Sequence, residues 1–81
     1  LTEERRKELI KILKSMTEKN KVSIRNIRRE ANEELKKKLK EKSLTEDENK
    51  NFEKSTQKLT DDHIATIDKI TSDKEKEILQ L

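Results

Sequence analysis

Residues 22–32 read VSIRNIRREAN, and this stretch decides how the chain folds. Ile24, Ile27 and Ala31 recur three and four residues apart. Residues at this spacing are neighbours on one side of an α-helix. The stretch therefore predicts a helix with one buried side.

Three arginines, Arg25, Arg28 and Arg29, leave the same helix beside this side and next to one another. Guanidinium groups so close repel each other unless an anion lies across them. The planar fork of arginine suits phosphate, so an RNA or DNA backbone is the first candidate. The alternative is a solvated helix face whose positive charge is offset by nearby glutamates. This is the usual interpretation of a charge run taken alone.

The helical pattern extends in both directions from this stretch. Thr2 is suited to cap a helix over about residues 3–42, with Glu3 and Glu4 in its first turn. Asn20 fills the one gap in the apolar stripe and is a candidate for setting register. The stripe consists of Leu9, Ile12, Leu13, Met16, Ile24, Ile27, Ala31, Leu35 and Leu39.

The pattern breaks at residues 42–45, KSLT, and the turn is expected at about residues 43–45. Thr45 and Glu48 have the spacing of a capping box, which predicts a second helix over about residues 46–80. So short a connection makes the helices antiparallel neighbours, so the predicted fold is all-α, a hairpin of two long helices. The apolar side of the second helix consists of Phe52, Leu59, Ile64, Ile67, Ile70 and Ile78.

Charge is sorted between the predicted helices. Residues 1–42 hold 15 Lys and Arg against 8 Asp and Glu, a net charge of +7, whereas residues 43–81 hold 6 against 10, a net charge of −4. Around the first helix the bases gather on one flank and most glutamates on the other, with Glu18 the exception. This flank predicts a phosphate-binding stripe made of Lys14, Lys21, Arg25, Arg28, Arg29, Asn32 and Lys36. Asn32 also fits a tolerated surface residue.

Charged residues make up 48% of the 81-residue chain and apolar residues 27%, so the expected core is thin. The chain is therefore expected to need a partner: missing segments of its own protein, a second copy or a large ligand. Leu1, in place of methionine, fits a fragment or a processed product. The aliphatic stripe is needed to pack the second helix, so no membrane contact is expected, and a cytoplasmic location is the default.

No group of residues predicts catalysis. His63 is the only histidine and lies on or beside the apolar stripe, where packing is the expected role. The chain has no cysteine for a disulfide or thiolate site and no glycine for a phosphate-cradling loop. We expect no enzyme activity, cofactor or metal, and recognition of an RNA backbone and its shape by side chains.

Five segments resemble the bacterial ribosome recycling factor family: LTEERRK at 1–7, VSIRNIRREAN at 22–32, QKLTD at 57–61, DKE at 73–75 and EILQL at 77–81. The resemblance covers the whole chain. It implies a long three-helix bundle with a β-rich domain inserted between the first and second helices. The bundle lies on large-subunit ribosomal RNA and, with elongation factor G, splits the ribosome after termination. The resemblance also implies that arginines of the second bundle helix contact RNA, a role that maps onto Arg25, Arg28 and Arg29, above all Arg28.

The chain resembles only the second and third bundle helices, so the first helix and the β domain are absent. A bare pair should expose a groove, and it is expected either to dimerise into a four-helix arrangement or to be partly ordered. The prediction is thus a fragment of a translation factor that binds ribosomal RNA. The alternative is a structural hairpin or coiled-coil module that binds another protein, for which Leu35 and Ile67 would matter and the arginines would not.

Overall fold

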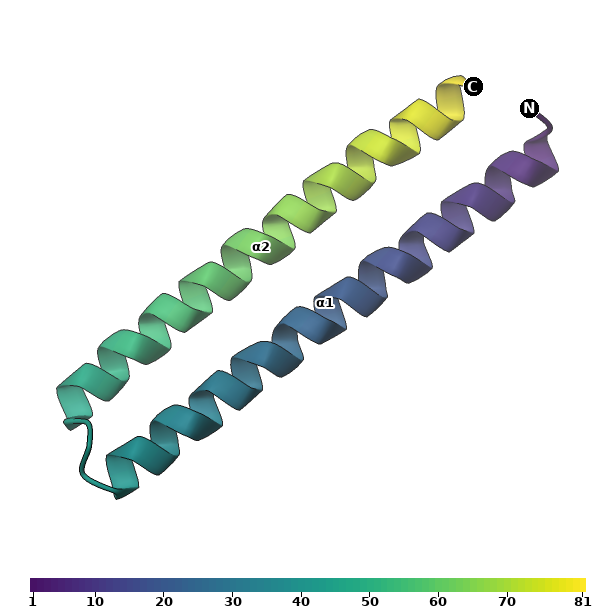
Figure 1. The fold of residues 1–81 in the computed structure, drawn as a ribbon. Coiled ribbons are helices and arrows are strands. Elements are labelled where there is room, and N and C mark those ends of the chain that lie inside the picture. Colours follow the sequence, from purple (N-terminus) through teal and green to yellow (C-terminus); the bar gives the residue numbers. More distant parts are fainter.

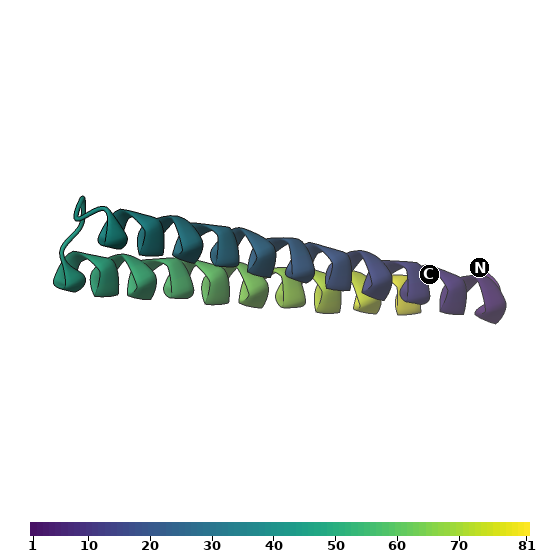
Figure 2. The ribbon, with the colours of Figure 1, turned by 90° about the horizontal axis from the view of Figure 1, so that it is seen from below.

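The computed structural model describes all of residues 1–81 as two long helices. Helix α1 spans Glu3–Lys40 and helix α2 spans Glu46–Gln80. The helices run antiparallel, with both chain termini at one end and the connecting turn at the other (Figure 1). Seen after a quarter turn, the molecule is a single layer of helices (Figure 2), and its Cα atoms extend over 60 × 15 × 9 Å. The predicted all-α hairpin is confirmed.

Each helix begins at a threonine that accepts a backbone hydrogen bond. Thr2 Oγ1 accepts from the Arg5 N–H at 3.1 Å. At the second helix Thr45 Oγ1 accepts from the Glu48 N–H at 3.1 Å, and Glu48 Oε1 accepts from the Thr45 N–H at 3.1 Å. These bonds satisfy amide groups that have no partner within the helix. The capping box predicted from the sequence is therefore confirmed.

Helix α1 ends at Lys40, two residues before the expected boundary at about residue 42. The Ser43 N–H donates to the Lys38 carbonyl at 2.9 Å, and the Lys42 N–H donates to the Leu39 carbonyl at 3.1 Å. This pair of bonds is a Schellman motif, which requires a left-handed residue just beyond the helix. Lys42 takes that role with φ 63°, although glycine is the usual residue there. Because this residue is a lysine and not a glycine, the end of the helix could not be located from the sequence.

Replacing Lys42 with glycine is expected to raise the free energy of unfolding by about 0.5–1 kcal/mol, because glycine adopts positive φ without the steric cost of a Cβ atom. Lys42→Ala keeps the Cβ atom and is the matched control, with unchanged stability expected. Urea unfolding followed by circular dichroism, at one protein concentration, measures both. Equal stabilities for the two variants would contradict this description of the turn.

The contact between the helices is thin and partly polar. Thr60 is the one buried residue, at 5% exposure, and no apolar side chain is fully buried. Thr17 Oγ1 and Thr71 Oγ1 lie 2.7 Å apart across the helix pair, so one hydroxyl donates to the other. Half-buried apolar residues supply the rest of the contact: Leu9, Ile10, Leu13, Ile24, Ala31, Leu35 and Leu39 from α1 with Ile64, Ile67 and Ile78 from α2.

Two ion pairs join the helices at a spacing of seven residues. Lys21 Nζ contacts Asp68 Oδ1, and Lys14 Nζ lies 3.7 Å from Glu75 Oε1. Near the termini, the Arg6 guanidinium donates to the Leu81 carbonyl and pairs with Glu3. Polar contacts therefore accompany the helix pair along its half nearest the termini.

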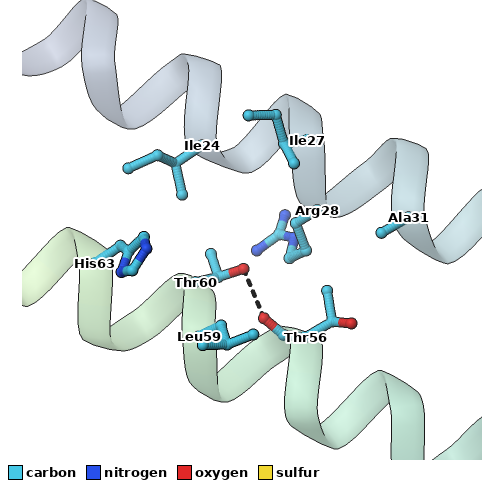
Figure 3. Close-up of a pocket in the computed structure, with 8 residues that line it drawn as sticks. All are labelled: Ile24, Ile27, Arg28, Ala31, Thr56, Leu59, Thr60 and His63. Carbon is cyan, nitrogen blue, oxygen red and sulfur yellow. Dashed lines mark hydrogen bonds between the residues drawn. The ribbon is translucent and has the colours of Figure 1, made fainter.

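One face of the hairpin is apolar and uncovered. A groove of about 410 Å³ lies on it, lined by Ile24, Ile27, Arg28 and Ala31 of α1 and Thr56, Leu59, Thr60 and His63 of α2 (Figure 3). Ile27 and Leu59 are 64% and 61% exposed. The groove that the sequence analysis expected of a bare helix pair is thus present.

Candidate nucleic-acid interface

Arg28 lies at the line where the two helices meet. Its side chain projects from α1 toward Thr56 and Thr60 of α2 and forms one wall of the apolar groove (Figure 3). The residue is half-buried, and no carboxylate lies within ion-pair distance of its guanidinium. A partly desolvated cation without an internal partner gains more from an external anion than a fully hydrated one does.

Arg25 and Arg29 are the other two arginines of the predicted site, and both are accessible. Arg25 Nη1 lies 3.8 Å from Glu18 Oε1, and the side chains are 39% and 66% exposed. An ion pair this long and this exposed contributes little, so Arg25 is available to another anion. Arg29 is exposed, and its only side-chain partner is the Asn26 amide oxygen at 3.4 Å.

Lys21 and Lys14 differ from the arginines because both contact carboxylates of α2. The Lys21 side chain is only 18% exposed and pairs with Asp68. Lys14 is 64% exposed and pairs with Glu75, whose side chain is 32% exposed. The basic flank predicted on α1 is therefore partly neutralised toward the chain termini, and its unpaired charge lies nearer the turn.

Asn32 and Lys36 continue the basic flank toward the turn. The half-buried Asn32 side chain has an amide oxygen that is buried without a hydrogen-bond partner. It lines a shallow hollow with Lys36, and both helices contribute to that hollow. Lys36 is exposed and has no carboxylate within ion-pair distance.

Two lysines of α2 join this surface and were missed by the sequence analysis. Lys50 and Lys54 line a second hollow with Asn32, together with Glu53 and Gln57. Both are exposed and neither has an ion-pair partner. They lie four residues apart, which places them on one side of α2. This spacing could have identified both lysines as part of the basic surface. The net negative charge of the second helix led the sequence analysis to leave them out.

Other kinds of site find little support. The chain has no cluster of three or more His, Cys, Asp or Glu side chains that could hold a metal ion. His63 is exposed at the wall of the apolar groove, near Thr60 and Leu59 (Figure 3). Neither helix contains a stretch long and apolar enough to span a membrane.

The geometry defines a helical hairpin in which one helix is strongly basic. Comparison with known proteins adds the family: the sequence profile described as "Ribosome recycling factor" matches residues 1–79, and the chain belongs to that family. The family acts in protein biosynthesis, in ribosome recycling, and the predicted resemblance is confirmed. Such translation factors are not enzymes, in agreement with the sequence analysis.

Ribosome-recycling factors of several bacteria are similar to this chain over its whole length. Identity is 57% to the protein of Geobacillus sp. (strain WCH70), 57% to that of Enterococcus faecalis (strain ATCC 700802 / V583) and 59% to that of Streptococcus suis (strain 05ZYH33). Each match covers 100% of this chain and 44% of the relative. The chain thus spans less than half the length of these curated relatives.

Proposed function

We propose that this chain is the part of a ribosome recycling factor that contacts large-subunit ribosomal RNA. Arg25, Arg28 and Arg29 provide the main contacts to phosphate, and Asn32 and Lys36 extend the surface toward the turn. Lys14 and Lys21 belong to the same flank but contribute less, because Glu75 and Asp68 already neutralise them. The intact protein acts in the cytoplasm with elongation factor G to split ribosomes after termination.

The observation that carries this proposal is the contrast between paired and unpaired cations. Two of the three arginines, Arg28 and Arg29, have no carboxylate partner, although the chain contains 18 acidic residues. Unpaired guanidinium groups on one surface raise the local concentration of a polyanion and can bind phosphate in a bidentate way. The chain has no Trp or Tyr and a single Phe, so few side chains can stack on bases, which favours recognition of the RNA backbone.

Alanine variants of Arg28 and Arg29 test the RNA contact. Each is expected to weaken binding to isolated large ribosomal subunits by about 10- to 150-fold, because a hydrogen bond to a charged group contributes about 1.5–3 kcal/mol. Lys69→Ala is the matched control, since Lys69 is 77% exposed and pairs only with Asp73 of its own helix. Fluorescence anisotropy of the labelled chain measures affinity, and circular dichroism checks that helicity is retained. Full affinity in Arg28→Ala would remove the proposed contact.

The exposed apolar face favours a second candidate function, a hairpin module that binds another polypeptide. Truncating Ile27 or Leu59, which are 64% and 61% exposed on this face, would then abolish binding, whereas Arg25→Ala and Arg28→Ala would leave it unchanged. Pull-down of a candidate polypeptide with these four variants separates the two functions, because RNA binding has the opposite dependence on the arginines.

A further inference from the structure

The series of ion pairs between the two helices stops half-way along the hairpin. Its two members, Lys14 with Glu75 and Lys21 with Asp68, are separated by seven residues on each helix. Because packed helices keep their register from one such step to the next, a third pair is expected seven residues further toward the turn. The cation at that position is Arg28, which has no carboxylate within ion-pair distance. The missing pair therefore needs a local cause.

The acid in register with Arg28 is Asp61. Arg28 lines the groove with Thr60 and His63, so Asp61, which lies between these two in the sequence, is at the level of Arg28 along the hairpin (Figure 3). Asp61 is exposed and accepts a hydrogen bond from the Gln57 amide, with 2.9 Å between Gln57 Nε2 and Asp61 Oδ1. The bond runs from one turn of α2 to the next, so it holds the carboxylate on its own helix.

A second amide and acid of α2 repeat this arrangement nearer the turn. Glu53 and Lys36 line the same hollow but form no ion pair. The Asn49 amide donates to the Glu53 carboxylate, with 3.1 Å between Asn49 Nδ2 and Glu53 Oε1. Here too the amide four residues earlier bonds to the acid, and the cation of α1 is left unpaired.

The two acids nearer the termini have no such amide. Thr71 lies four residues before Glu75, and Ile64 lies four residues before Asp68. Isoleucine has no donor, and the Thr71 hydroxyl is bonded to the Ile67 carbonyl at 2.8 Å. These four acids therefore follow one rule. An acid with an amide four residues earlier leaves the cation of α1 unpaired, whereas an acid without one neutralises it.

We propose that Gln57 is a positioning residue that keeps Arg28 available for an anion by holding Asp61 on α2. Without this bond the carboxylate can turn toward α1 and pair with Arg28, as Asp68 pairs with Lys21. The anion is the RNA phosphate of the proposed function, on which this inference rests. Gln57 thereby sets how many cations of the surface are free to bind phosphate, with no contact of its own to RNA.

A double-mutant cycle at residues 57 and 61 tests this role with large ribosomal subunits. Gln57→Ala is expected to weaken binding about three- to fivefold, because phosphate must then displace a partly exposed ion pair. In the Asp61→Asn background the same substitution should change the affinity less than about twofold, since no carboxylate is left to pair with Arg28. Fluorescence anisotropy of the labelled chain measures all four affinities.

Asn51→Ala is the matched control and should leave the affinity unchanged. Asn51 is exposed and lies nine residues before the buried Thr60, which places it on the side of α2 away from α1. Unchanged affinity in Gln57→Ala would overturn the proposal. An equal loss from Gln57→Ala in both backgrounds would mean that Gln57 contacts RNA itself, and would overturn it as well.

A measurement on the free chain separates this inference from RNA binding. Without RNA, Gln57→Ala should shift the ¹⁵N NMR signal of the Arg28 Nε–H group, and the shift should be absent in the Asp61→Asn background. An unmoved Arg28 signal would overturn the role of Gln57 even in a chain that binds ribosomal subunits. A shifted signal in a chain that does not bind subunits would support the role of Gln57 and overturn the RNA contact instead.

Discussion

Raising the salt concentration from 50 to 200 mM is expected to weaken binding of the chain to large ribosomal subunits by about 60- to 1000-fold. Four to six phosphates can be engaged by Arg25, Arg28, Arg29 and Lys36 with Lys50 and Lys54, which gives a logarithmic slope of about −3 to −5. The slope arises because each neutralised phosphate releases condensed counterions. Affinity measured by fluorescence anisotropy across a salt series gives this slope directly.

The slope also reports which cations take part. Arg29→Ala should make it shallower by about one, since that variant removes one phosphate contact. Lys21→Ala should change the slope less, because Lys21 is largely enclosed and already neutralised by Asp68. A flat salt dependence in the wild-type chain would exclude phosphate contact as the source of affinity, and equal slope changes in both variants would contradict the distinction between paired and unpaired cations.

Replacing Ile67 with aspartate is expected to abolish most of the helical signal of the chain at 25 °C. Ile67 is half-buried beside Ile24 of α1, so the substitution removes apolar contact and places a carboxylate between the helices. Together these effects cost about 3 kcal/mol or more. With one buried residue in the whole hairpin, such a loss is comparable with the total stability.

The control for this experiment is Ala65→Asp, which introduces the same carboxylate on the same helix. Ala65 is exposed, so its variant loses helix propensity but no contact between the helices. Circular dichroism of both variants at one concentration should show a folded control and an unfolded Ile67→Asp. Two equally helical variants would mean that helix α2 does not depend on contact with α1.

The sequence predicted the fold well because the deciding signals are local. The side chains of Thr2 and Thr45 cap the two helices as their positions indicated, since an N-cap needs only a hydroxyl and an amide three residues later. The end of α1 was less predictable. A Schellman motif depends on one backbone angle, and Lys42 adopts the left-handed conformation without the glycine that normally indicates it.

The candidate site was predicted only in part because it depends on both helices. A helical projection of α1 placed Lys21 beside Arg25, but the carboxylate that neutralises Lys21 belongs to Asp68, which is 47 residues further along the chain. In the same way Lys50 and Lys54 approach Asn32 only in the folded hairpin. The pattern within one helix shows which charges share a side, whereas the register between helices decides which of them are already neutralised.

The two ion pairs between the helices, Lys14 with Glu75 and Lys21 with Asp68, have a consequence for how the hairpin finds its alignment. If α2 slid by seven residues, Lys14 would meet Asp68 and Lys21 would meet Asp61, so a misaligned hairpin would also be electrostatically satisfied. The sliding would move the reversal of the chain by about three to four residues, into the last turn of α1, which would have to unwind. The left-handed turn at Lys42 therefore excludes the register shifted by seven residues, which the ion pairs alone would allow.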